Sequence, residues 1–144
     1  MPNMEKGMLM FGRLYEWGCK IPGVGVPMVR AWNRMMGSLI FRAPGPGGKR
    51  KDSISEVKDY LLWSGKEMKF PFEIIEESAK PESFEFYVNG CPYGFKRPDQ
   101  LKACDAAMEM DRKLFALLGA ELTVLESAPE HGVQKCKMLM KWRG

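Results

Sequence analysis

The sequence has no apolar run long enough to cross a membrane, and its first residues do not have the pattern typical of a secretory signal. Arg30, Arg34 and Arg42 interrupt the longest apolar stretch, which stays short of the ~20 residues that a spanning helix needs. The N-terminus lacks the succession of basic, apolar and small residues that marks a secretory signal, and it carries Glu5 early. We therefore expect a cytoplasmic protein without a transmembrane segment.

Metal-binding and nucleotide-binding motifs of the common kinds are also missing. Four cysteines are present, at positions 19, 91, 104 and 136, and none of them forms a Cys-x-x-Cys pair. In a cytoplasmic chain such cysteines are expected to be reduced and not bridged. The Gly-rich stretches at 23–25 and 45–48 lack the Lys-Ser/Thr pair of a P-loop, so nucleotide binding has little support.

The composition is that of a globular protein, with 45% hydrophobic and 28% charged residues. The charge is unevenly distributed, because residues 1–51 hold nine Lys or Arg against two acidic residues, whereas residues 52–144 hold thirteen against sixteen. A basic half can mark a nucleic-acid or anionic-membrane partner. Here the cations are scattered singly and no nucleic-acid-binding motif is visible, so a solvated basic surface is favoured and a nucleic-acid partner is not expected.

The periodicity of apolar residues predicts helices first and strands later. Apolar residues recur at helical spacing in three N-terminal segments, and a helix from Pro98 to Leu118 ends at Gly119. Apolar residues alternate in four strand-like segments. The expected helices cover 5–20, 27–39, 53–65 and 98–118, and the expected strands include 70–74, 84–88, 122–126 and 136–142.

This order predicts a single α+β domain over residues 1–144, with N-terminal helices followed by a mainly antiparallel four-stranded sheet and a long helix packed on one face. We divide it into a basic helical segment (1–43), a Gly/Pro loop (44–52) and an α-β-β-α-β-β core (53–144). Met and Trp residues along the first two helices could line an apolar pocket, belong to the core, or form a homo-oligomer contact.

Three cysteines fall on elements that can converge. Cys91 ends a predicted strand, Cys104 lies in the second turn of the long helix, and Cys136 lies on the inward face of the last strand, opposite a row of lysines. Thiolates gathered in this way could bind zinc or an iron–sulfur cluster, or one of them could act as a nucleophile. The alternative is that they are small apolar side chains of the core.

Three acidic residues accompany the cysteines. The alternation of the strand places Glu126 on the core side, where an unpaired carboxylate is costly and needs a metal, a cation or an acid–base role. The alternative is that the strand ends one residue earlier and Glu126 faces solvent. Asp105 directly follows Cys104 and could orient a cysteine-centred site or a substrate cation. Cys104, Met108 and Asp111 share one stripe of the helix through i+4 and i+7 spacing.

At Cys91-Pro92-Tyr93, Cys104-Asp105 and Gly132-x-x-x-Cys136, the C-terminal half resembles the L-2-amino-thiazoline-4-carboxylic acid hydrolase-like family. That family has a Cys-Pro-aromatic step, a later Cys-Asp and a closing Gly-Asp-x-x-Cys strand, whereas this chain has Val133 in place of the second Asp. The match covers roughly residues 84–142. The closing pattern is also similar to the 4-vinyl-reductase domain, a small-ligand module in which cysteines and a glutamate can hold zinc; Glu126 and Cys136 match two of those positions.

The resemblance implies a hydrolase that opens a small cyclic amidine or a related C–N bond. A thiolate of Cys91 or Cys104, or a metal-bound water, would attack, and Asp105 or Glu126 would move protons. The alternative is a non-catalytic module that binds a metal, an iron–sulfur cluster or a small ligand through Cys91, Cys104, Cys136 and Glu126. A third hypothesis is an interaction domain whose basic helices dock a partner or an anionic surface.

Overall fold

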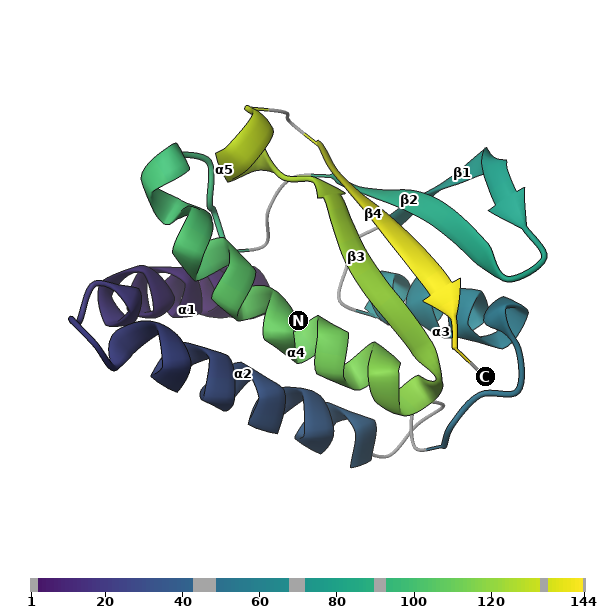
Figure 1. The fold of residues 1–144 in the computed structure, drawn as a ribbon, viewed down its shortest axis with the longest axis horizontal. Helices are drawn as coiled ribbons and strands as arrows, with labels where there is room; N and C mark the ends of the chain where they lie inside the picture. The colour runs from purple at the N-terminus through teal and green to yellow at the C-terminus, as the bar shows by residue number, and fades with distance from the viewer. Residues whose placement is uncertain (1–2, 43–48, 68–71, 90–92, 133–134, 144) are drawn as a thin grey trace.

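The computed structural model describes residues 3–42, 49–67, 72–89, 93–132 and 135–143, and it has the α+β architecture expected from the sequence (Figure 1). Three helices come first, and a sheet interrupted by a long helix follows. The elements are α1 (Asn3–Cys19), α2 (Gly25–Arg42), α3 (Ile54–Glu67), β1 (Phe72–Lys80), β2 (Ser83–Asn89), the short 3₁₀ turn η1 (Pro98–Gln100), α4 (Leu101–Leu118), β3 (Ala120–Glu126), α5 (Ala128–His131) and β4 (Lys135–Trp142).

The four strands form one antiparallel sheet in the order β1-β2-β4-β3. The register of β2 and β4 pairs Phe86 with Met138 and Val88 with Cys136. Because side chains alternate along a strand, these four residues share one face of the sheet, and all of them are buried. The inward orientation predicted for Cys136 from the lysines around it is therefore confirmed.

Helix α3 begins at the cap that the sequence predicts. The Ser53 hydroxyl accepts a hydrogen bond from the Glu56 backbone N–H at 3.3 Å, and the Glu56 carboxylate accepts one from the Asp52 N–H at 2.6 Å. Val57 and Leu61 are buried as expected. The apolar spacing of this helix would turn Leu62 inward together with Val57 and Leu61. Leu62 is exposed instead, because consecutive residues of a helix point about 100° apart.

Helix α4 contacts both the sheet and the N-terminal helices (Figure 1). Its large residues, including Leu114, Phe115 and Leu118, join the core against the sheet and α3. Ala103 and Ala107, on its other side, belong to a second buried cluster with residues of α1 and α2. The left-handed Gly119 ends the helix, as the sequence predicts.

Small side chains allow α2 to approach α4 closely. Gly37 of α2 is buried, and a Cβ added there would meet the carbonyl oxygen of Met110 and lie 3.1 Å from the Cβ of Lys113. This contact falls within the last turns of α2, which continues to Arg42 and so exceeds the helix of residues 27–39 expected from the sequence. The close contact fixes α2 along the whole side of α4 and shields that side from solvent.

Several expectations fall outside the described residues, namely Phe70 of the first strand, most of the Gly/Pro loop and Cys91. Between β3 and β4 lies the short helix α5, followed by Gly132 with a left-handed backbone. None of the helices that the structure describes is both long and apolar enough to cross a membrane.

Candidate functional site

A cavity of about 250 Å³ lies between the inner face of the sheet and the helices that cover it. The sheet contributes side chains from every strand, and α3 and α4 close the opposite side. The lining is mostly aromatic and aliphatic. It includes Tyr60, Leu61, Phe72, Phe86, Val88, Tyr93, Phe95, Met108, Leu114, Phe115, Leu122 and Met138. Binding sites for small organic molecules are typically concave and apolar in this way, with a few polar groups.

Two of the three cysteines singled out in the sequence reach this cavity. Cys104 approaches it from α4 and Cys136 from β4, and both are thiols. Cys104 is half-buried, whereas Cys136 is buried against the sheet. Both residues line the same cavity, but a cysteine cluster stays a prediction, and Cys91 lies outside the described residues.

Asp111 is the acidic side chain that the sequence reasoning left without a role. It lines the cavity from α4, two turns after Cys104. Within the described part of the chain, no hydrogen bond or ion pair reaches its carboxylate. Burial raises the pKa of Asp111 to about 6, although the charge of Arg112 acts in the opposite direction. A half-buried carboxylate on a mostly apolar lining, with no ion pair among the described residues, is a candidate for binding a cation or moving a proton.

Asp111 also influences the tyrosine beside it. Burial raises the pKa of Tyr60, and the negative charge of Asp111 raises it further. Tyr60 comes from α3 and lines the same cavity. A phenol and a carboxylate from different helices therefore provide polar groups on a mostly apolar lining, to which Ser64 and Glu67 of α3 also contribute.

Asp105 faces a separate, more open groove, and two arginine side chains compensate its negative charge. This groove of about 730 Å³ runs between α4 and β3, and its lining includes Cys104 and Met108, which also line the cavity. The Asp105 carboxylate accepts hydrogen bonds from Arg30 at 2.7 Å and Arg112 at 2.8 Å. Burial alone would raise the pKa of Asp105, but these two guanidinium groups outweigh it and hold the pKa below its usual range. Asp105 is therefore held in ion pairs with two arginines, and its role beside a cysteine centre stays a prediction.

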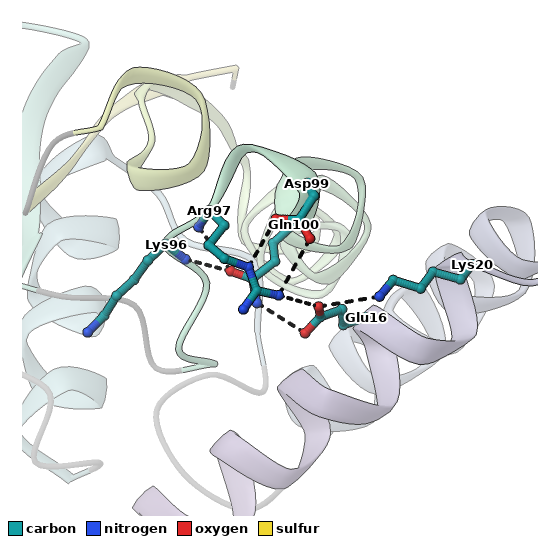
Figure 2. A network of polar contacts seen from close by, with 6 residues as sticks. All are labelled: Glu16, Lys20, Lys96, Arg97, Asp99 and Gln100. Carbon is teal, nitrogen blue, oxygen red and sulfur yellow. Dashed lines mark hydrogen bonds and ion pairs between the residues drawn. The ribbon is translucent and has the colours of Figure 1, made fainter.

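The segment before α4 closes one side of the cavity and is anchored on α1 (Figure 2). The Glu16 carboxylate accepts hydrogen bonds from Arg97 at 2.7 Å and from the Gln100 amide at 3.0 Å. The Gln100 oxygen in turn accepts hydrogen bonds from the backbone N–H groups of Lys96 and Arg97 at 2.9 and 3.0 Å. These contacts hold the segment in place, so that Phe95 stays buried in the cavity wall.

Glu126 does not face the cavity. The register of β3 against β4 shifts between Val124 and Glu126, so the alternation that would turn Glu126 inward is broken. Its side chain is exposed, as in the second alternative, but the strand does not end earlier: β3 runs to Glu126, and the shift in register turns this side chain outward.

The described residues alone do not form a metal site. No group of three His, Cys, Asp or Glu side chains that could hold a metal ion occurs among them. Cys104 and Cys136 supply two thiols, which is fewer than the three or four protein ligands of a zinc or iron–sulfur site. The ligand set expected from the sequence also contains Cys91, which is not described, so zinc or a cluster stays a prediction. The chemistry below therefore uses the side chains of this chain alone.

Comparison of the sequence with protein-family models finds no matching family, and comparison with curated proteins finds no match.

Proposed function

We propose that this chain is a small-ligand-binding domain whose ligand is an apolar molecule with one amine or other cationic group. The observation that supports this proposal most strongly is the carboxylate of Asp111, which lines an apolar cavity and has no hydrogen bond or ion pair among the described residues. A bound ammonium group would give this carboxylate the partner that it lacks, since a charge-assisted hydrogen bond is stronger than a neutral one.

The cavity volume limits the size of the ligand. An engineered apolar cavity of about 150 Å³ binds benzene. The cavity beside Asp111 measures about 250 Å³ and therefore has room for a bicyclic aromatic ring or a chain of similar volume. Phe72, Phe86 and Phe115 provide aromatic surface for stacking or edge contacts with such a ring.

A series of indoles of similar size but different charge tests this proposal. Binding of tryptamine (cationic), 3-methylindole (neutral) and indole-3-propionate (anionic) is measured by isothermal titration calorimetry at pH 7.5. We expect tryptamine to bind about tenfold more tightly than 3-methylindole, because its ammonium group pairs with ionised Asp111. Indole-3-propionate should bind most weakly, because two carboxylates would repel each other in the cavity.

Asp111→Asn is the decisive variant for this series. It should remove the preference for tryptamine over 3-methylindole while leaving the binding of 3-methylindole nearly unchanged. Asp59→Asn is the matched control, because Asp59 is an exposed acid on α3 that does not line the cavity, and it should keep the wild-type order. Equal binding of all three indoles to the wild-type protein, or no binding, would contradict the proposal.

A hydrolase acting on a small cyclic amidine is a second candidate, favoured by the presence of Cys104 and Asp111 on the lining of one cavity. The ionised carboxylate of Asp111 would attract the amidinium, and the thiolate of Cys104 would form a bond to its central carbon. The C–N bond of the ring would then break, and a proton from the solvent would pass to the leaving nitrogen. Water would release the product from sulfur.

Turnover of a 2-amino-thiazoline by single Cys→Ser variants distinguishes this candidate from a binding domain. If Cys104 is the nucleophile, Cys104→Ser should reduce kcat at least 100-fold while tryptamine binding persists, and Cys136→Ser, whose residue is buried in the sheet, should retain most of the turnover. Full turnover in Cys91→Ser, Cys104→Ser and Cys136→Ser would exclude a cysteine mechanism. Absence of turnover in the wild-type protein would leave only the binding function.

A further inference from the structure

The outward side of the first two helices has an unusually apolar surface. On α1, Leu14 and Trp17 are exposed; on α2, Met28, Trp32, Met35 and Leu39 recur at intervals of four, three and four residues. That spacing places them along one side of the helix. The exposed fraction reaches 68% at Trp17 and 51% at Met28, and no part of the chain that the structure describes covers them. We call these six residues the α1–α2 apolar face.

The two rows of this face lie on the same side of the molecule. Helices α1 and α2 contact each other, and a Cβ added at Gly18 of α1 would lie 3.1 Å from Val29 of α2. Tyr15 and Val29 point from these helices into one buried cluster shared with α4. The six residues of the apolar face lie outside this buried cluster, so both helices offer exposed apolar side chains to a partner.

The charge around this face has one sign. Helix α2 contains three arginines and no Asp or Glu. Arg30 is paired with Asp105, but Arg13, Arg34 and Arg42 are exposed, with no ion pair seen in the described ranges. A second copy of the chain docked on this face would bring cations against cations. A flat surface with negative charge is complementary to it.

We propose that the α1–α2 apolar face binds the surface of a bilayer that contains anionic phospholipids. An amphipathic helix binds in this way by burying apolar side chains at the boundary between headgroups and acyl chains, while basic residues contact the lipid phosphates. Trp17 and Trp32 suit this boundary, because the indole ring is amphipathic and accumulates there. The helices lie in the plane of the surface, and the cavity between α4 and the sheet remains on the side away from the lipid.

Vesicle binding tests this proposal without reference to the cavity. The full chain is titrated with phosphatidylcholine vesicles, with and without added phosphatidylserine, and binding is followed by co-sedimentation and tryptophan emission. We expect binding only to the anionic vesicles, a shift of the emission to shorter wavelength, and weaker binding as salt is added. Arg13→Gln and Arg34→Gln should each lower the affinity about fivefold, and Trp17→Ser about tenfold.

Leu125→Ser is the matched control, since Leu125 is an exposed apolar residue at the end of β3, away from α1 and α2. It should bind anionic vesicles as the wild-type protein does, and so should Asp111→Asn, which alters only the cavity. Circular dichroism checks that each variant is folded. The proposal would be overturned by equal binding to neutral and anionic vesicles or by no vesicle binding. It would also be overturned by a dimer in solution that Trp17→Ser dissociates, a result that would assign the face to a second copy of the chain.

Discussion

Replacing Asp111 with asparagine should stabilise the protein at pH 7 by about 3 kcal/mol and leave its stability near pH 3 unchanged. Burial raises the pKa of Asp111 from 3.8 to about 6, so the folded state binds a proton more tightly than the unfolded chain does. Protonated Asp111 therefore contributes its full stabilisation below the pKa that this residue has in the unfolded chain. The contribution is lost as the pH rises through the folded-state pKa of about 6. Asparagine is neutral at every pH and avoids the loss. Urea unfolding of both proteins from pH 3 to 8 measures the difference.

Asp105→Asn is the control for this prediction, because Asp105 lies on the same helix but its pKa is shifted in the opposite direction. Arg112 and Arg30 outweigh burial and lower the pKa of Asp105, so its ionised form stabilises the fold and its removal should destabilise the protein above about pH 4. Arg112→Gln should raise the pKa of Asp111 further, because the charge of Arg112 lowers it. Equal stability of Asp111→Asn and wild type at pH 7 would show that this carboxylate is hydrated normally.

The second large effect concerns the contact between α2 and α4. Gly37→Ala should destabilise the protein by about 2 kcal/mol, because the new methyl group meets the carbonyl oxygen of Met110, which belongs to the backbone of α4 and cannot rotate away. In an open helical position the same substitution usually stabilises by roughly 0.5–1 kcal/mol. Thermal and urea unfolding measure the change in the free energy of unfolding.

Gly7→Ala provides the comparison for Gly37→Ala. Gly7 lies inside α1, and no atom outside its own helix turn lies within 4 Å of an added Cβ. We expect this variant to be as stable as the wild-type protein or slightly more stable. If Gly37→Ala behaves in the same way, α2 does not approach α4 as closely as the structure has it, and the shielding of α4 by α2 would need revision.

The elements that the sequence predicts well are those where a local pattern and the tertiary environment agree. The alternation of Cys136, Met138 and Met140 with lysines predicts which face of β4 is buried, because only one face can pack on the core. Ser53 and Glu56 predict the start of α3 through hydrogen bonds that form within one turn. Gly119 predicts the end of α4 for the same local reason.

The parts that the sequence predicts poorly depend on contacts between distant segments. Glu126 is exposed because the pairing of β3 with β4 shifts at that point, and no pattern in β3 alone records the shift. Asp111 shares a stripe with Cys104 and Met108, which the sequence reveals, but its burial depends on α3 and the sheet. The exposure of Trp17 and Met28 likewise depends on which sides of α1 and α2 pack on α4. That the cysteines bind a metal or form the active site of a hydrolase stays a prediction.

The most direct measurement of the central claim is an NMR titration of the Asp111 side-chain carboxyl carbon, with and without tryptamine. The resonance is assigned by its absence from Asp111→Asn. The account predicts a pKa of about 6 for the protein alone and a decrease of about one unit or more when the amine is bound, since ion pairing favours the ionised form. A pKa near 3.8, or a pKa that tryptamine leaves unchanged, would contradict it.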